Sequence, residues 1–218
     1  MGVERRGGGQ PSSVDAWEHD VFLSCCGERA EQAAVLVRAA LIEFGKRHRP
    51  QWERRIFIDR LALKAGEPDA RAIEPLVASR VLVVVLDRET AGSTWANSEI
   101  ETWLATTGST DRLLLVSCSP ELDLTWRQGS FVRADHVPPV LQQAFASAPS
   151  VFDLSMEGGP ADRERLALYA AIAHIDLTEL EADERRFQRR RHRRGDLVRL
   201  LALGLVILLA VLGFVAAR

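Results

Sequence analysis

The chain has 218 residues, of which 47% are hydrophobic and 27% are charged. That composition excludes a disordered or collagen-like chain, and the length allows one domain of ordinary size plus an appendage. The net charge of −2 hides an asymmetry, because the chain up to Glu184 holds 19 basic and 29 acidic residues while the last 34 residues carry a net charge of +8. The basic excess therefore lies at the C-terminal end.

The first 18 residues are expected to form a disordered arm, since they are rich in glycine and charge up to residue 13 and contain no apolar stretch that would suggest a signal peptide. Two of the three cysteines, Cys25 and Cys26, are adjacent, and the third is Cys118. Neighbouring cysteines rarely bridge and an odd number leaves one over, so a disulfide framework is excluded and a reduced, cytosolic body is expected.

Five short apolar runs predict strands that are buried on both faces, at residues 21–24, 56–58, 81–86, 113–116 and 151–154. A first helix is expected over residues 30–44, ending at Gly45, with a buried face formed by Ala33, Leu36, Val37, Ala40, Leu41 and Phe44. A second helix is expected over residues 69–79, kinked by Pro75. A third should begin near Thr94 with Ser93 as its N-cap. This alternation predicts an α/β fold, a flavodoxin-like doubly wound parallel sheet of five strands with its ligand site at the strands' C-terminal ends.

A membrane-spanning helix is expected at the C-terminal end. Residues 200–217 contain no charge and would form a helix about 27 Å long, extended to residue 197 if Arg199 reaches the interface. Seven arginines between Arg185 and Arg194 precede it, which favours a cytoplasmic body and contact with anionic lipids. Because this run abuts the span and holds one aromatic residue, Phe187, membrane contact explains it more simply than nucleic-acid binding.

Chemistry-bearing residues follow the strands. The first strand ends in D-V-F-L-S, which places the Ser24 hydroxyl at the sheet edge, where the next helix could also face an anion. The second strand and the loop after it read F-I-D-R-L-A-L-K-A-G, from Phe57 to Gly66. The third strand is preceded by S-R at residues 79–80, and the segment S-T-W-A-N-S-E-I follows it at residues 93–100. Three histidines have no acid or nucleophile at motif spacing and are expected at the surface or an edge, namely His19, His136 and His174.

In order and spacing these segments resemble the Toll/interleukin-1 receptor (TIR) domain family, and the basic segment with its span resembles bacterial TIR proteins anchored in a membrane. The resemblance implies a TIR domain over residues 19–176, a basic juxtamembrane helix or linker over 177–196 and a transmembrane helix over 197–217. It implies a module that signals by pairing with other TIR domains through the loop that holds Arg60, Leu63, Gly66 and Pro68. It also implies, as in many members, hydrolysis of NAD to nicotinamide and an ADP-ribose product.

The same resemblance implies that Glu99, four residues after Trp95, is the catalytic residue. A carboxylate beside the ribose can stabilise the oxocarbenium character that develops as the N-glycosidic bond breaks. The four-residue spacing places the indole of Trp95 on the same face of the helix, where it can form a wall of the pocket. Ser24 is expected to bind substrate, and Asp59 either contacts the ribose or caps the following loop. NAD is then a substrate, and neither a cofactor nor a metal is expected.

Two departures from the family pattern keep a non-enzymatic scaffold open as the alternative. After the first strand, where many members place a tyrosine and a basic or polar residue, this chain has Cys25, Cys26 and Gly27. Two positions after the loop glycine, where some active members place an aromatic residue, it has Pro68. A nucleoside-processing enzyme of similar architecture is a third, weaker hypothesis, because no base-reading signature is visible.

Overall fold

The structure, a computed structural model, describes residues 17–48, 55–58, 70–155 and 159–187. The described part of the chain falls into two units, one up to Ile172 and one from Ala173 on, which are taken separately below. The strands of the first unit are β1 (His19–Cys25), β2 (Ile56–Ile58), β3 (Ser79–Leu86), β4 (Leu113–Ser117), β5 (Trp126–Arg127), β6 (Ser130–Phe131) and β7 (Val151–Asp153). The helices are α1 (Glu28–His48), α3 (Ala70–Val77), α4 (Arg88–Gly92), α5 (Thr94–Thr107), α6 (Pro139–Ala144) and α7 (Gly159–Ala173), with a short 3₁₀ turn at Ala134–His136.

Five of the strands form one parallel sheet in the order β2-β1-β3-β4-β7, and β5 and β6 form a separate antiparallel ribbon. The order reverses between β1 and β3, as in the doubly wound folds whose ligands bind at that switch point. The parallel five-stranded α/β sheet expected from the sequence is confirmed. The two central strands are almost fully buried because helices cover both of their faces.

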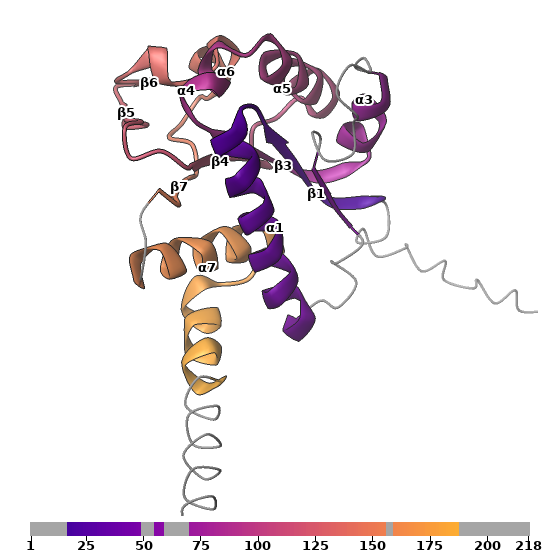
Figure 1. Ribbon diagram of the computed structural model, residues 1–218, viewed down its shortest axis with the longest axis vertical. Coiled ribbons are helices and arrows are strands. Elements are labelled where there is room, and N and C mark those ends of the chain that lie inside the picture. Colours follow the sequence, from indigo (N-terminus) through magenta and orange to yellow (C-terminus); the bar gives the residue numbers. More distant parts are fainter. Residues whose placement is uncertain (1–16, 49–54, 59–69, 156–158, 188–218) are drawn as a thin grey trace, which may run out of the picture. The chain divides into compact units, whose positions relative to one another are not determined.

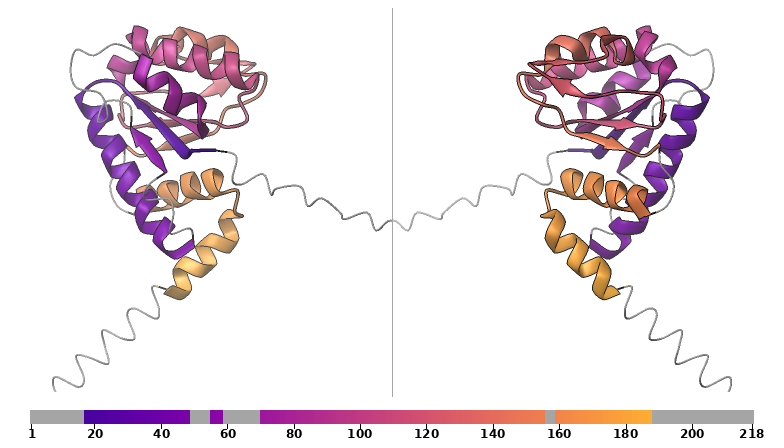
Figure 2. Two further views of the ribbon diagram at one scale, coloured as in Figure 1. Left: turned by 90° about the vertical axis from the view of Figure 1, so that its right-hand side faces the viewer. Right: turned by 90° about the vertical axis from the view of Figure 1, so that its left-hand side faces the viewer.

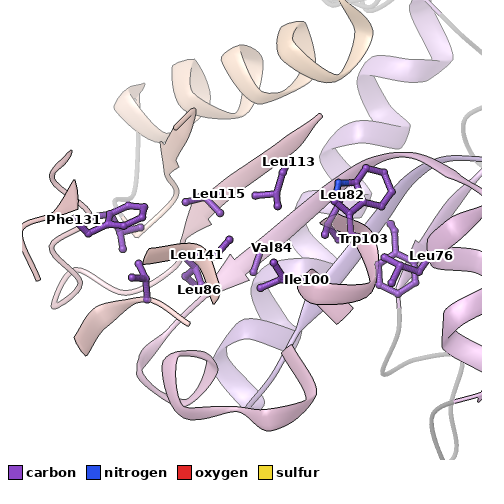
Figure 3. Packing of buried hydrophobic residues seen from close by; sticks show 13 residues of the cluster. Leu76, Leu82, Val84, Leu86, Ile100, Trp103, Leu113, Leu115, Phe131 and Leu141 are labelled. Atoms are coloured by element: carbon purple, nitrogen blue, oxygen red, sulfur yellow. The ribbon is translucent and has the colours of Figure 1, made fainter. Parts of the chain in front are cut away.

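Side chains alternate between the two faces of the sheet, and each face has its own helices (Figures 1 and 2). α1 and α7 lie on one face, where the rings of Phe44 and Tyr169 pack with centroids 5.4 Å apart. α3, α5 and α6 lie on the other face, where Figure 3 shows the main core cluster. Its members are Phe22, Leu76, Leu82, Val84, Leu86, Ile100, Trp103, Leu113, Leu115, Leu124, Phe131, Val137 and Leu141.

The structure corrects the predicted face of the first helix. Leu36, which was expected in the core, is 62% exposed, while the most buried side chains of α1 are Ala30, Ala34, Val37 and Leu41. The sequence of α1 carries apolar residues around most of its circumference, so the helical period alone did not single out the stripe that meets the sheet.

A second correction concerns His136, which was expected at the surface or an edge. Its side chain is buried, and Nδ1 accepts a 2.8 Å hydrogen bond from the backbone N–H of Asp123. The imidazole therefore links the segment after β4 to the 3₁₀ turn. No local sequence motif predicts this contact.

The second unit includes a helix at residues 177–187. Within the described ranges, no helix is both long and apolar enough to cross a membrane. The expected span at 197–217 lies outside the described residues, as do the arginines from residue 189 on.

Candidate functional site

The helix α5 is well defined at both ends. Ser93 caps its N-terminus as expected, because its Oγ accepts a hydrogen bond of 3.2 Å from the backbone N–H of Ala96. Gly108 ends it in the left-handed conformation, with φ of +64°, and its N–H bonds the carbonyl of Leu104 at 2.9 Å. A helix fixed in this way holds its side chains in set positions over the sheet.

Glu99 occupies a core position of α5. The buried residues of this helix are Ala96, Glu99, Ile100 and Trp103, which follow the spacing of one helical face. Glu99 is only 6% exposed, whereas Glu101, two residues on, is exposed. Acidic side chains are seldom buried unless a partner stabilises them, so a glutamate in this stripe points to a function rather than to solvation of the helix.

The partner comes from the central strand β1. Ser24 is fully buried, and its hydroxyl donates a 2.6 Å hydrogen bond to Oε2 of Glu99. Side chains alternate along a strand, so Ser24 lies on the same face of β1 as Phe22, which packs in the core cluster with Ile100 and Trp103 of α5. The motif at the end of the first strand and the Trp-plus-four motif are thus brought together across 75 residues of sequence.

A pocket of about 250 Å³ opens beside this pair. Its described lining comes from α3 and α5 and consists of Ile73, Leu76, Thr94, Trp95, Ser98, Glu99 and Thr102. Within this lining Glu99 is the only charged side chain, and the others are an indole, two aliphatic side chains and three that carry a hydroxyl group. A pocket wall that combines apolar side chains with a few hydroxyl groups and one carboxylate is typical of a site for a small organic ligand.

The sequence predicted some of these residues and missed others. Trp95 and Glu99 both line the pocket, as their spacing suggests. Ile73 and Leu76 of α3 were not foreseen, because nothing local marks α3 as a wall for α5. Thr94, Ser98 and Thr102 were also missed, although their repeat every four residues beside Trp95 and Glu99 is a signal that could have found them.

Several predicted site residues cannot be placed. Asp59 and the loop residues Arg60, Leu63, Gly66 and Pro68 lie outside the described residues. Their assigned roles stay predictions. Within the described part of the chain, no group of three or more His, Cys, Asp or Glu side chains could hold a metal ion.

The start of α1, where the sequence suggested an anion could bind, faces acidic side chains instead. Gly27 adopts a φ of +91°, and a methyl group placed there would collide with the carboxylate of Glu89 and lie 3.1 Å from Oδ2 of Asp87. Asp87 is itself held by Thr90, whose backbone N–H and hydroxyl each donate to Oδ1 at 2.8 Å. Two carboxylates at this helix start disfavour a bound phosphate.

The thiols near these strand ends are free and differ in exposure. Cys25 is buried, while Cys26 and Cys118 are partly exposed. Burial, with a further contribution from the nearby charge of Asp87, raises the pKa of the Cys118 thiol to about 12. Cys118 is therefore a protonated, weakly reactive thiol at neutral pH.

Comparison with known proteins gives a sequence relative that matches most of the chain. No family model matches the chain. The chain is 30% identical over 204 residues to the NAD(+) hydrolase ApTIR of Actinoplanes sp., in a match that covers 87% of this chain and 28% of that protein. The TIR domains of the activated Roq1 resistosome that recognizes the pathogen effector XopQ are 29% identical over 45% of this chain and 57% of theirs, with a TM-score of 0.35. Along most of its length the chain is thus similar to part of this hydrolase, and its five-stranded parallel sheet is the one that the resemblance to TIR domains implies.

Proposed function

We propose that this chain hydrolyses NAD to nicotinamide and an ADP-ribose product, with Glu99 as its catalytic residue. The observation that carries the proposal is a carboxylate that is 6% exposed, hydrogen-bonded to Ser24 and part of the wall of a pocket that also contains Trp95. The similar Actinoplanes protein is named an NAD(+) hydrolase, and this chain spans 28% of its length. The activity is therefore proposed for this chain on its own geometry.

The reaction needs little more than a well-placed negative charge. When the bond between C1′ of the ribose and the nicotinamide nitrogen breaks, the electron pair leaves with the nicotinamide, which departs neutral and needs no acid. The ribose develops oxocarbenium character, which the Glu99 carboxylate can stabilise from a partly dry pocket. Water then adds to C1′ and releases its proton, so the products are nicotinamide and ADP-ribose.

The size and lining of the pocket support one end of a dinucleotide as its occupant. At about 250 Å³ it is smaller than the roughly 300–1,000 Å³ of sites that enclose drug-sized ligands. The indole of Trp95 offers a flat surface for the positively charged pyridinium ring, and the hydroxyl of Ser98 lies in the same lining for the sugar. The hydroxyl of Thr102 donates to the carbonyl of Ser98 at 2.8 Å. We propose that the nicotinamide riboside end enters and that the rest of NAD stays outside.

The test is nicotinamide release by the full-length chain, clustered on lipid vesicles and incubated with NAD. Glu99→Gln keeps the shape of the side chain and removes its charge, and nicotinamide release should fall about a hundredfold or more. The matched control is Glu101→Gln on the same helix, whose exposed carboxylate should be dispensable. Equal losses from the two substitutions would contradict the assignment.

The alternative is a TIR scaffold that signals by pairing without cleaving NAD. Its support is the run Cys25, Cys26, Gly27 at the end of β1, where many members of the family place a tyrosine and a basic or polar residue, and Pro68, where some active members place an aromatic residue. If the clustered parent protein releases no nicotinamide, the scaffold replaces the enzyme as the function of this chain.

We further propose that the chain associates with other TIR domains through the segment Arg60–Pro68 and is anchored by residues 197–217, with its body in the cytoplasm. Support for the anchor is the uncharged apolar stretch after an arginine-rich segment. Membrane fractionation without detergent tests the anchor, and recovery of the intact chain in the supernatant would refute it.

Replacement of Gly66 by a bulky residue tests the association, which should be lost while the monomer stays folded.

A further inference from the structure

We propose that Ser24 is a positioning residue that keeps Glu99 ionised and aimed at the pocket, and that it does not itself contact the substrate. This inference rests on the proposed NAD cleavage for its kinetic part only. The observation is the 2.6 Å hydrogen bond from the Ser24 hydroxyl to Oε2 of Glu99, formed by a serine that is fully buried.

Two observations indicate that Ser24 does not contact the substrate: its side chain is buried, and its only hydroxyl proton is already donated to Glu99. Ser24 is 0% exposed, and it is absent from the described lining of the pocket, which Glu99 reaches. A serine hydroxyl carries a single proton, and here that proton is given to Oε2 of Glu99. No donor remains on Ser24 for a ribose hydroxyl or a phosphate oxygen.

The backbone beneath Ser24 makes the donor position rigid. Its strand β1 is paired on both sides, with Leu23 opposite Ile58 of β2 and Ser24 opposite Val84 of β3. A donor fixed in a central strand restricts the carboxylate of Glu99 to one orientation, as catalytic geometry requires.

The hydrogen bond also favours the ionised form of Glu99. A carboxylate that is 6% exposed loses most of its hydration, which favours the neutral acid. A hydroxyl that donates to the ionised form favours the anion, by an amount that corresponds to about one to two pH units for a charged acceptor. Only the anion stabilises an oxocarbenium ion, so loss of the donor should move the onset of activity to higher pH.

The kinetic experiment compares the full-length parent with Ser24→Ala and Ser24→Thr. Ser24→Ala should shift the acidic limb of the kcat profile upward by about one pH unit or more, with KM changed less than threefold. Ser24→Thr restores a hydroxyl and should return the profile toward the parent. An unshifted profile in Ser24→Ala, or a change confined to KM, would overturn the proposal.

A matched control removes a hydroxyl of the same kind elsewhere. Ser117 ends β4 on the face that also carries Leu115, is 5% exposed, and donates to the carbonyl of Ser119 at 3.2 Å. Ser117→Ala should leave the pH profile unchanged. A shift as large as that of Ser24→Ala would show that any buried serine has this effect, and the proposal would fail.

A second readout does not depend on catalysis. The carboxyl carbon of Glu99, identified by its absence from the spectrum of Glu99→Gln, can be titrated by NMR in ¹³C-glutamate-labelled full-length protein. Ser24→Ala should raise the pH midpoint of this titration by about one to two units, whereas Ser117→Ala should not. If the parent releases no nicotinamide, the proposed function fails while this titration still decides the role of Ser24, and an unmoved midpoint refutes it.

Discussion

The pair formed by Ser24 and Glu99 should be energetically coupled in the folded state, and a double-mutant cycle can measure that coupling. Ser24→Ala leaves a buried carboxylate without this donor. Glu99→Ala leaves a fully buried hydroxyl without this acceptor and also opens space in the pocket wall. The double variant removes both groups together, so neither is left buried without the other.

The expected magnitude follows from the type of bond. A hydrogen bond to a charged group contributes about 1.5–3 kcal/mol, and a buried polar group that loses its partner costs about 1–3 kcal/mol. Each single substitution should therefore lower the free energy of unfolding clearly. The double variant should be less destabilised than the sum of the two single variants by about 1.5–3 kcal/mol, since the two single costs include the same bond.

Urea unfolding of the full-length chain in mild detergent, followed by far-UV circular dichroism at pH 7, gives the four free energies. A parallel cycle with Ser117→Ala and Glu99→Ala is the control, because Ser117 bonds the carbonyl of Ser119. That cycle should be additive within about 0.5 kcal/mol. If the Ser24 cycle is additive to the same degree, the hydrogen bond contributes nothing measurable and the reasoning about Glu99 is refuted.

The other predictions concern groups outside the lining of the pocket. Asp20→Ala removes a buried carboxylate that lies 3.2 Å from Nε of Arg55 and 3.9 Å from Nε of Arg80. The free energy of unfolding in urea should fall by about 3 kcal/mol. A loss under about 0.5 kcal/mol would mean that water solvates the two arginines and that the ion pairs contribute nothing. Ser93→Ala removes the N-cap of α5 and should cost about 1 kcal/mol, while Ser93→Asp should retain most of the stability. Burial raises the pKa of Cys118 to about 12, so iodoacetamide at pH 8 should label it far more slowly in the native than in the unfolded chain, as mass spectrometry can show. In the unfolded chain the Cys118 thiol loses its proton near pH 9, whereas in the folded chain it keeps the proton up to about pH 12. The free energy of unfolding should therefore fall as the pH rises from about 9 towards 12.

The order of elements could be predicted from sequence because apolar runs and helical periods mark the central strands. The run at 81–86 became β3, which begins two residues earlier because His19 of β1 pairs with Ser79. Polar residues such as these join a strand through backbone pairing, which hydropathy does not register. The short elements β5, β6 and α6 were missed because two to six residues give too little period to detect.

The site was predictable only as separate pieces. The spacing of Trp95 and Glu99 places both on one side of a helix, and the end of β1 supplies a hydroxyl at the sheet edge. Nothing local in the sequence states that Ser24 and Glu99 meet, because their contact depends on the register of β1 and on the packing of α5 over it. The α3 side of the pocket is likewise a consequence of how α3 and α5 pack.

The same geometry explains why chemistry in this sheet should centre on α5 rather than on the loop after β1. Doubly wound folds commonly bind phosphate where the first helix begins, using its free N–H groups. Here Asp87 and Glu89 approach that point at Gly27, and Thr90 fixes Asp87 in place, so a phosphate would meet negative charge. Ser24 projects to the opposite face, towards Glu99 and the pocket between α3 and α5. The residues at positions 25–27 lie between the end of β1 and the start of α1, and the pair on which the proposed cleavage depends is formed without them.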